Sequence, residues 1–220
     1  MTVPDPEDPV WDPREDLQTR RLETLSDGIF AIVMTILVFD LKSLSGPADQ
    51  LPSALIQLWP NFLGYAVSFS LLGIYWLGHL SQFRFIRNTD HNFIWINILF
   101  FGLVALVPFS TASLSRFPFS PVTLALYAGN LIFIGIALYL PWRYATRNHR
   151  LVDRSLPEHV VLYGTLRCLG APAGYAVALG LSLLSPVLAL AFFILIPLLY
   201  ILPAFHPVWI HLAKQLVKEG

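Results

Sequence analysis

Charged residues and cysteine are both scarce in this chain. Lys, Arg, Asp and Glu make up 13% of its 220 residues, about half the share found in a soluble globular protein. The single cysteine, Cys168, excludes an intrachain disulfide framework. The net charge of zero excludes the basic surface that nucleic-acid binding needs. Apolar residues, by contrast, account for 55% of the chain, and its mean hydropathy is +0.62. This composition indicates an integral membrane protein.

The first 18 residues are rich in proline and acidic side chains and show no pattern that would build a core. We expect residues 1–18 to form a disordered cytoplasmic segment. They also lack the basic start, short apolar run and small-residue cleavage site of a signal peptide. The apolar segment that follows is therefore expected to stay in the mature protein as its first spanning helix.

Six segments are long enough to cross a hydrocarbon core of about 30 Å, which takes roughly 20 helical residues. We assign them to one transmembrane domain over residues 19–212, followed by a cytoplasmic tail over residues 213–220. Only Ser185 and Pro186 separate the last two segments, which are predicted to form a tight hairpin. The predicted fold is an all-α membrane protein with spans near Leu22–Leu41, Ala54–Leu80, Phe93–Leu114, Val122–Trp142, Val160–Leu184 and Val187–Ile210.

The distribution of Lys and Arg predicts the orientation, because short cytoplasmic loops are enriched in these residues. With both termini inside, the outer side receives only Lys42 and Arg116, and Arg167 falls within the fifth span. The inner side receives the other eleven basic residues, namely Arg14, Arg20, Arg21, Arg84, Arg87, Arg143, Arg147, Arg150, Arg154, Lys214 and Lys218. The sequence therefore predicts a multi-pass protein of the cell (inner) membrane with both termini in the cytoplasm.

Few charged residues lie inside the predicted spans, where each costs about 2.5–3.5 kcal/mol and needs a partner or a function. Asp27 in the first span and His79 in the second lie at similar depths from the cytoplasmic face. Together with Arg21, and with Asp90 or Arg167, they are expected to form one ionic cluster that ties the helix ends together. The alternative is that these side chains reach the headgroups separately, which suits Arg21 better than Asp27.

One face of the first span combines apolar side chains with a hydroxyl group. Gly28, Ile32, Thr35 and Phe39 recur at steps of four, three and four residues, so they form one line along a helix, the first-helix stripe. Asp27 lies about 140° around the axis from Ile32 and so faces away from the stripe. Such a stripe fits a pore lining around a symmetry axis, but the spacing alone favours ordinary packing.

Other chemistries find less support in the sequence. A proton relay would use Asp27 and His79, yet Thr35 is the only polar residue between Asp27 and Asp40 in the first span. An enzyme is not expected, because the chain lacks the HExxH and GxSxG motifs. A potassium filter of backbone carbonyls is not expected either, because the sequence has no Thr-Val-Gly-Tyr-Gly loop.

The residues that open the first span resemble a family signature. The run Arg21-Leu-Glu-Thr-Leu-Ser-Asp-Gly28 is similar to the Arg-x-x-x-Phe-Ser-Asp-Gly motif of the transmembrane protein 175 family of potassium channels. With six spans the chain resembles the single-repeat prokaryotic form, so the resemblance implies a homotetramer. Further landmarks of the family are matched by Trp76-x-x-His79, Phe83, Asp90, Asn97 and Pro108-Phe109.

In that family four copies of the first helix line the pore, without a separate filter loop. The resemblance implies a hydrophobic constriction at Ile32, a threonine layer at Thr35 that meets passing K⁺, and an outer apolar layer at Phe39, with Gly28 on the same stripe. It also implies a structural polar network beside the pore, made of Arg21, Ser26, Asp27, His79, Asp90 and Asn97.

Two positions depart from the family pattern. Leu25 replaces the signature phenylalanine, and Phe39 stands where the family usually has a smaller aliphatic residue, which predicts a narrower outer constriction. The sequence therefore predicts a potassium-preferring channel for monovalent cations in contact with membrane lipid. It predicts no enzymatic activity, no cofactor, no resident metal ion and no nucleic-acid partner. The alternative is a proton-coupled or proton-conducting transporter that uses Asp27 and His79.

Overall fold

The computed structural model describes residues 13–41 and 51–202, and the regular structure in these ranges is helical. An isolated β-bridge joins Ile86 to Val152. In chain order the helices are α1 (Pro13–Ile36), the 3-10 helix η1 (Leu37–Asp40), α2 (Leu51–Gln57), α3 (Trp59–Phe83), α4 (His91–Val104), α5 (Val107–Arg116), α6 (Pro121–Thr146), the 3-10 helix η3 (Arg147–His149), α7 (Glu158–Ser182) and α8 (Pro186–Ile201).

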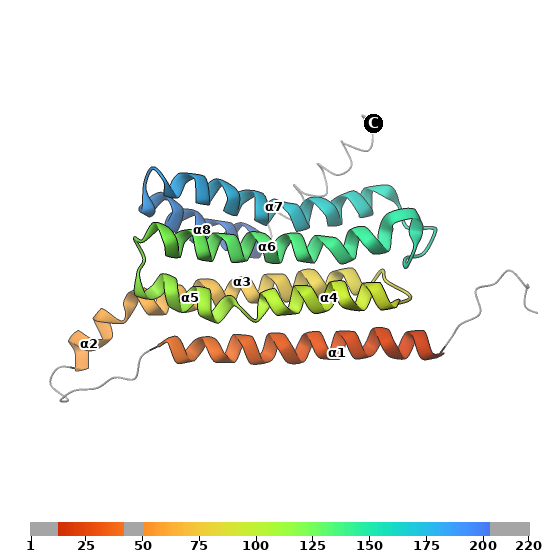
Figure 1. Cartoon of the computed structure of the whole chain (residues 1–220), viewed down its shortest axis with the longest axis horizontal. Coiled ribbons are helices and arrows are strands. Elements are labelled where there is room, and N and C mark those ends of the chain that lie inside the picture. The colour runs from red at the N-terminus through yellow and green to blue at the C-terminus, as the bar shows by residue number, and fades with distance from the viewer. Residues whose placement is uncertain (1–12, 42–50, 203–220) are drawn as a thin grey trace, which may run out of the picture.

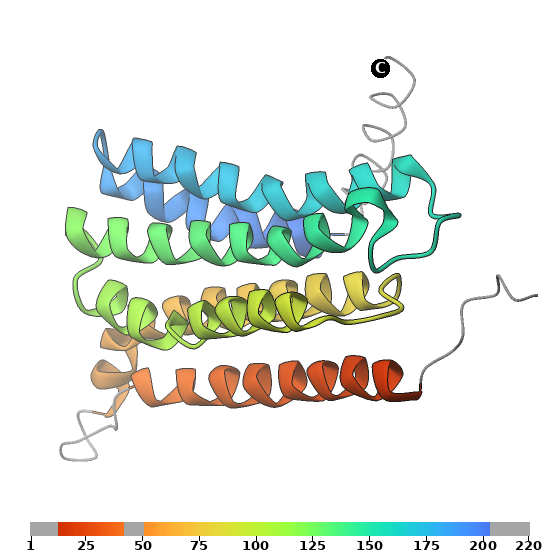
Figure 2. The ribbon, with the colours of Figure 1, turned by 45° about the vertical axis from the view of Figure 1, so that its right-hand side comes forward.

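The long helices run side by side in three layers (Figures 1 and 2). α1 forms one outer layer, α3, α4 and α5 form the middle layer, and α6, α7 and α8 form the other outer layer. α1 packs on α3, α4 and α5 of the middle layer. On the other side of that layer, α6 packs on α4 and α5 and also on α7 of its own layer. Within the described part of the chain, α1 is therefore covered by other helices on one side only.

Four helical segments are long and apolar enough to cross a membrane, and they correspond to the first four predicted spans. α7 has 25 residues and α8 has 16, so at about 1.5 Å per residue α8 is well short of a full crossing. Membrane crossing by α7 and α8 stays a prediction, and the end of the sixth predicted span and the C-terminal tail lie outside the described residues. The four segments are Leu17–Asp40, Trp59–Phe83, His91–Arg116 and Pro121–His149.

The predicted hairpin between the last two helices is confirmed. α7 ends at Ser182, and α8 begins at Pro186 after Ser185 in an extended conformation. Proline suits the first position of a helix, because the backbone N–H there has no partner within the helix. The two helices pack against each other along the outer layer (Figure 2).

Prolines interrupt the second and third predicted spans. α2 and α3 meet at Leu58, and Pro60 is the second residue of α3. Ala105 and Leu106 separate α4 from α5, and Pro108 is the second residue of α5. A proline has no backbone N–H, and its ring collides with the preceding turn, so a helix breaks shortly before it.

The prediction of a disordered segment up to residue 18 is wrong at its C-terminal end. α1 begins at Pro13, so residues 13–18 are helical, while residues 1–12 lie outside the described residues. Proline is favoured at the first position of a helix, and residues 14–18 contain no glycine or proline to stop one. The helix of the first span therefore extends beyond its apolar part.

Close packing at two glycines holds α7 against α6. A Cβ atom on Gly135 of α6 would overlap the ring of Pro172, and a Cβ atom on Gly164 of α7 would lie 2.6 Å from the ring of Trp142. Small residues allow two helix backbones to approach closely in a membrane, where apolar burial alone does not drive helix association.

Candidate functional site

One face of α1 is buried against the bundle. It includes Leu22, Ser26, Phe30 and Val33 and continues with Leu37 of η1. Their spacing of four, four, three and four residues is that of one face of an α-helix. This face fixes the rotation of α1 about its own axis.

The first-helix stripe lies on the opposite face of α1. Each of its residues stands two positions after a buried residue, and two positions correspond to about 200° around the axis. Gly28 and Thr35 are exposed, and so are Ile32 (59%) and Phe39 (79%). The Thr35 hydroxyl donates a hydrogen bond of 2.8 Å to the carbonyl oxygen of Ile32. The described residues of the chain thus leave this apolar face uncovered along the helix.

His79 of α3 connects α1 to α4. Its ring is only 2% exposed, with Nδ1 3.2 Å from Oγ of Ser26 and Nε2 3.0 Å from Oδ1 of Asn97. Ser26 and Asn97 are buried as well. The ring also stacks on Phe100, with 5.5 Å between centroids, and contacts Phe83. Both ring nitrogens are therefore paired in surroundings that are otherwise apolar.

The contacts of Asn97 determine which nitrogen of His79 carries the proton. The side-chain nitrogen of Asn97 donates to the carbonyl oxygen of Phe93 at 2.8 Å, so the amide oxygen faces His79 and only accepts. Nε2 of His79 is therefore the donor to Asn97, and Nδ1 of the neutral ring accepts from the hydroxyl of Ser26. Among the described residues no carboxylate bonds to this ring. The neutral form of His79 therefore makes both hydrogen bonds, one with Ser26 and one with Asn97.

Asp27 bonds to Trp76 rather than to His79. The indole Nε1–H of Trp76 donates to Oδ1 of Asp27 at 2.8 Å, which turns the carboxylate toward its own chain. Trp76 and His79 stand three residues apart on α3 and so lie on the same side of that helix. Since Ser26 and Asp27 are neighbours on α1, two adjacent contacts tie this part of α1 to α3.

Asp90 belongs to a separate group at the start of α4. One carboxylate oxygen accepts from the backbone N–H of Phe93 at 2.8 Å, and the other accepts from the hydroxyl of Tyr144 at 2.7 Å and lies 3.2 Å from Arg150. Burial raises the pKa of the Asp90 carboxyl, but the hydrogen bonds from Phe93 and Tyr144 and the charge of Arg150 together lower that pKa below its ordinary value. Asp90 therefore joins α4 to α6 and the segment after it.

The polar residues that we expected in one ionic cluster are thus divided among several groups. Arg21 is exposed and makes no hydrogen bond or ion pair with other described residues, and Arg167 lies on α7 with its guanidinium 3.3 Å from the hydroxyl of Tyr163. Depth along the membrane normal does not fix which way a side chain faces around its helix. The role of Trp76 as the partner of Asp27 was missed, although its spacing from His79 places it on the face toward α1.

The described residues contain no group of three or more His, Cys, Asp or Glu side chains placed to hold a metal ion. Asp27, His79 and Asp90 are instead engaged in the hydrogen bonds described above.

Comparison with known proteins identifies the family. Residues 21–108 match the family model described as the endosomal/lysosomal potassium channel TMEM175. A potassium channel of Chamaesiphon minutus is 34% identical over 177 residues, which cover 78% of this chain and 87% of that protein. The endosomal/lysosomal proton channel TMEM175 of Homo sapiens is 32% identical over 120 residues, which cover 50% of this chain and 24% of that protein.

Comparison of the fold with solved structures identifies the same family. The crystal structure of a lysosomal potassium-selective channel TMEM175 homolog from Chamaesiphon minutus matches with a TM-score of 0.74 at 31% identity, and the match covers 83% of this chain and 96% of that one. The chain therefore belongs to the TMEM175 family of ion channels, which makes it a membrane channel protein and not an enzyme.

Proposed function

We propose that four copies of this chain form a potassium-preferring cation channel whose pore is surrounded by the four α1 helices. The observation that carries the proposal is the first-helix stripe, which the other described helices of the chain leave uncovered. Glycine and threonine interrupt its apolar side chains, which suits close approach of symmetry mates and contact with an ion. The relatives from Chamaesiphon minutus are a potassium channel and a potassium-selective channel, which supports the same assignment.

The proposed constriction lies at Ile32. From Gly28 to Phe39 the stripe rises about 16 Å, roughly half the thickness of the hydrocarbon core. Ile32 is one turn beyond Gly28, so a ring of four isoleucines follows a wider ring of glycines. A narrow apolar ring gates by dewetting, because it excludes water when the side chains approach and admits water when they separate. Phe39 provides the outer apolar layer.

Thr35 supplies the proposed potassium preference. It lies about 4.5 Å beyond Ile32 along the axis. Because its hydroxyl proton is donated to the carbonyl of Ile32, the hydroxyl oxygen presents its lone pairs to an ion in the pore. Four such oxygens replace part of the hydration shell, which favours the more easily dehydrated K⁺ over Na⁺. The preference is modest, because one ring of hydroxyls offers fewer and weaker ligands than stacked carbonyls. K⁺ is then a permeant ion near Thr35, and the channel needs no cofactor.

The polar contacts behind the stripe have a structural role in this proposal. They hold α1 at the rotation that presents Ile32 to the axis, and their side chains do not contact the ion. Asp90 contributes indirectly, by capping the α4 helix that carries Asn97. We assign this role to Ser26, Asp27, His79, Asp90 and Asn97. Arg21, the sixth residue expected in the network, makes no polar contact among the described residues.

We place the channel in the cell (inner) membrane with both termini in the cytoplasm. The arginines that follow α3 and those that follow α6 then share one side with the start of α1. Exposed apolar side chains such as Phe133 on α6, Val177 on α7 and Leu195 on α8 provide the surface toward lipid.

A proton-coupled or proton-conducting transporter is the second candidate, and the name of the human relative favours it. Such a transporter needs a path for protons past Asp27 and His79. His79 bonds to Ser26 and Asn97, whereas Asp27 bonds to Trp76. Among the described residues no hydrogen bond joins the two, which weakens this candidate relative to the channel.

Planar-bilayer recording of the purified chain under opposed K⁺ and Na⁺ gradients tests the channel proposal. The expected result is single-channel current whose reversal potential lies closer to the equilibrium potential of K⁺ than to that of Na⁺. Saturating, pH-driven flux that requires His79 and produces no unitary currents would identify a carrier instead. The absence of flux under any gradient would leave a protein that does not conduct.

Cysteine cross-linking tests the position of the stripe. Cys168 is the only cysteine in the sequence, so Cys168→Ser provides a background without thiols. In that background Ile32→Cys is expected to form disulfides between protomers, because equivalent residues meet at the axis. Val177→Cys, at a position 52% exposed on α7, is the matched control and should stay unlinked. Cross-links at position 177 but not at position 32 would exclude a central α1.

A further inference from the structure

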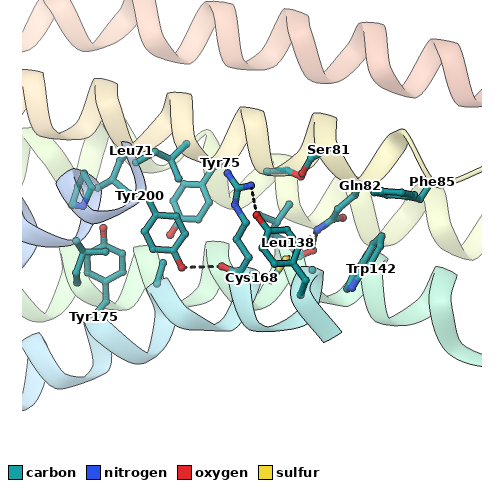
Figure 3. A pocket seen from close by; sticks show the side chains of 18 of the residues that line it. Leu71, Tyr75, Ser81, Gln82, Phe85, Leu138, Trp142, Cys168, Tyr175 and Tyr200 are labelled. Carbon is teal, nitrogen blue, oxygen red and sulfur yellow. Dashed lines mark hydrogen bonds between the residues drawn. The ribbon is translucent and has the colours of Figure 1, made fainter. Parts of the chain in front are cut away.

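A cavity lies among α3, α6, α7 and α8, and α3 separates it from α1 (Figure 3). Its volume is about 100 Å³, comparable with the roughly 150 Å³ of an engineered cavity that takes up benzene. Most of its wall is apolar and includes Leu71, Leu138, Ala171 and Ile196. The size and lining suit one small, largely apolar molecule.

Two buried polar atoms in the cavity wall lack a partner. Oε1 of Gln82 and the hydroxyl of Tyr175 form no hydrogen bond with the described residues, and their side chains are 4% and 0% exposed. Both residues line the cavity, and Figure 3 shows them toward its opposite ends. Buried polar groups are nearly always paired in folded proteins, so the unpaired acceptor of Gln82 points to an occupant.

The amide of Gln82 is held in one orientation. Its nitrogen donates to the carbonyl oxygen of Leu138 at 3.0 Å and lies 3.2 Å from the sulfur of Cys168. Both contacts use the donor side of the amide, which leaves Oε1 as an acceptor without a partner among the described residues. Only a hydrogen-bond donor on the occupant satisfies it, such as a hydroxyl group.

The groups around the cavity favour a neutral hydrogen-bond donor. A deprotonated anionic group accepts hydrogen bonds and cannot donate one to Oε1 of Gln82. A cation is disfavoured because Arg167, which lines the same cavity, carries a positive charge. Water is a weaker alternative, because an ordered water needs two to four polar partners and most of this wall is apolar.

We propose that this cavity binds a small neutral apolar molecule with one hydroxyl group, of about the size of a monocyclic aromatic alcohol. The hydroxyl donates to Oε1 of Gln82, and the ring fills the apolar space toward Tyr175. The site is formed on the side of α3 that carries Tyr75 and Gly78, behind the side that holds α1. The proposal does not depend on conduction.

Photolabelling tests this site on the full chain in lipid nanodiscs. The probe is benzyl alcohol that carries a diazirine, and mass spectrometry locates the adducts. Adducts are expected on cavity residues of α3 and α7. Unlabelled benzyl alcohol should displace the probe roughly fivefold to tenfold better than toluene at equal concentration in the membrane, because toluene has the ring without the hydrogen bond.

Three variants refine the test. Gln82→Met keeps the side-chain length and should abolish the advantage of benzyl alcohol over toluene. Gln57→Met makes the same change at an exposed position of α2 and should preserve the advantage. Ala171→Leu fills the cavity and should remove the adducts.

Several results would overturn the proposal. They are adducts confined to lipid-facing side chains such as Phe133, the absence of adducts, equal displacement by the two competitors, or a Gln82→Met chain that still prefers the alcohol. All but the last are measured on the unmodified chain, so the proposal stays testable if a variant does not fold.

Discussion

Replacing Asn97 by leucine removes one of the two partners of His79 while it keeps a buried side chain of similar size. In the unmodified chain Nε2–H of His79 donates to Asn97 over 3.0 Å, and the two side chains are 2% and 0% exposed. Leucine leaves this N–H buried beside Phe100 without an acceptor. An unsatisfied buried polar group costs about 1–3 kcal/mol, so we expect a loss of unfolding free energy of that size.

Thermal unfolding in detergent, followed by tryptophan fluorescence, measures this loss. For a chain of this size 1 kcal/mol shifts the Tm by about 2–4 °C, so Asn97→Leu is expected to lower the Tm by roughly 2–12 °C. Asn88→Leu, at an exposed position in the turn between α3 and α4, is the control. Its Tm should stay within about 2 °C of the unmodified chain, since exposed substitutions change stability little.

A double variant distinguishes a lost hydrogen bond from a general packing defect. In His79→Phe/Asn97→Leu both polar partners are gone, and the hydroxyl of Ser26 can bond to a carbonyl of its own helix. Removal of both partners is much less costly than removal of one, so the double variant should regain a large part of the lost Tm. An unchanged Tm for Asn97→Leu, or a double variant whose Tm is no higher than that of Asn97→Leu, would refute the reasoning.

The remaining predictions concern the stripe and its supports. Ile32→Asn should hydrate the constriction and raise K⁺ flux into liposomes, and unchanged flux would mean that Ile32 is no gate. Thr35→Ala should lower the ratio of K⁺ to Na⁺ permeability in the same assay, because it removes the only hydroxyl of the stripe; an unaltered ratio would remove Thr35 from selectivity. Asp27→Asn should reduce the yield of assembled channel, measured by size-exclusion chromatography, and should change the ratio of K⁺ to Na⁺ flux little. A stable assembly with an altered flux ratio would contradict this. Because the pKa of Asp90 is lowered from 3.8, its contacts with Phe93, Tyr144 and Arg150 contribute fully above about pH 5, and their contribution is lost as the pH falls from there through the lowered pKa of the folded state. Asp90→Asn should therefore flatten the dependence of Tm on pH below about 5, and an unchanged slope would show that this carboxyl contributes nothing.

Sequence reasoning identified the features that depend on residues close together in the chain. The lengths of the apolar runs predicted α3, α6 and α7 to within about five residues, because a spanning helix satisfies its own backbone hydrogen bonds. They missed the start of α1, which lies nine residues before Leu22. Ser185 and Pro186 predicted the turn before α8, because proline suits the start of a helix and disrupts its interior. The line formed by Gly28, Ile32, Thr35 and Phe39 follows from the helical period alone.

Only the tertiary structure decided which partners the polar residues choose. The sequence places Asp27, His79 and Asp90 near one level of the membrane, but the rotation of each helix is set by packing against helices that are distant in the chain. That packing directs Asp27 to Trp76, His79 to Ser26 and Asn97, and Asp90 toward α6.

The uncovered face of α1 and the cavity behind α3 likewise come from packing. The helical period groups Ile32 with Thr35, but it does not state whether neighbouring helices cover that face. The cavity is lined by four helices, and its unpaired atoms on Gln82 and Tyr175 arise because neighbouring side chains do not reach them. Local sequence fixes the conformation and period of each helix, whereas contacts and voids between helices depend on how all their side chains fill the shared space.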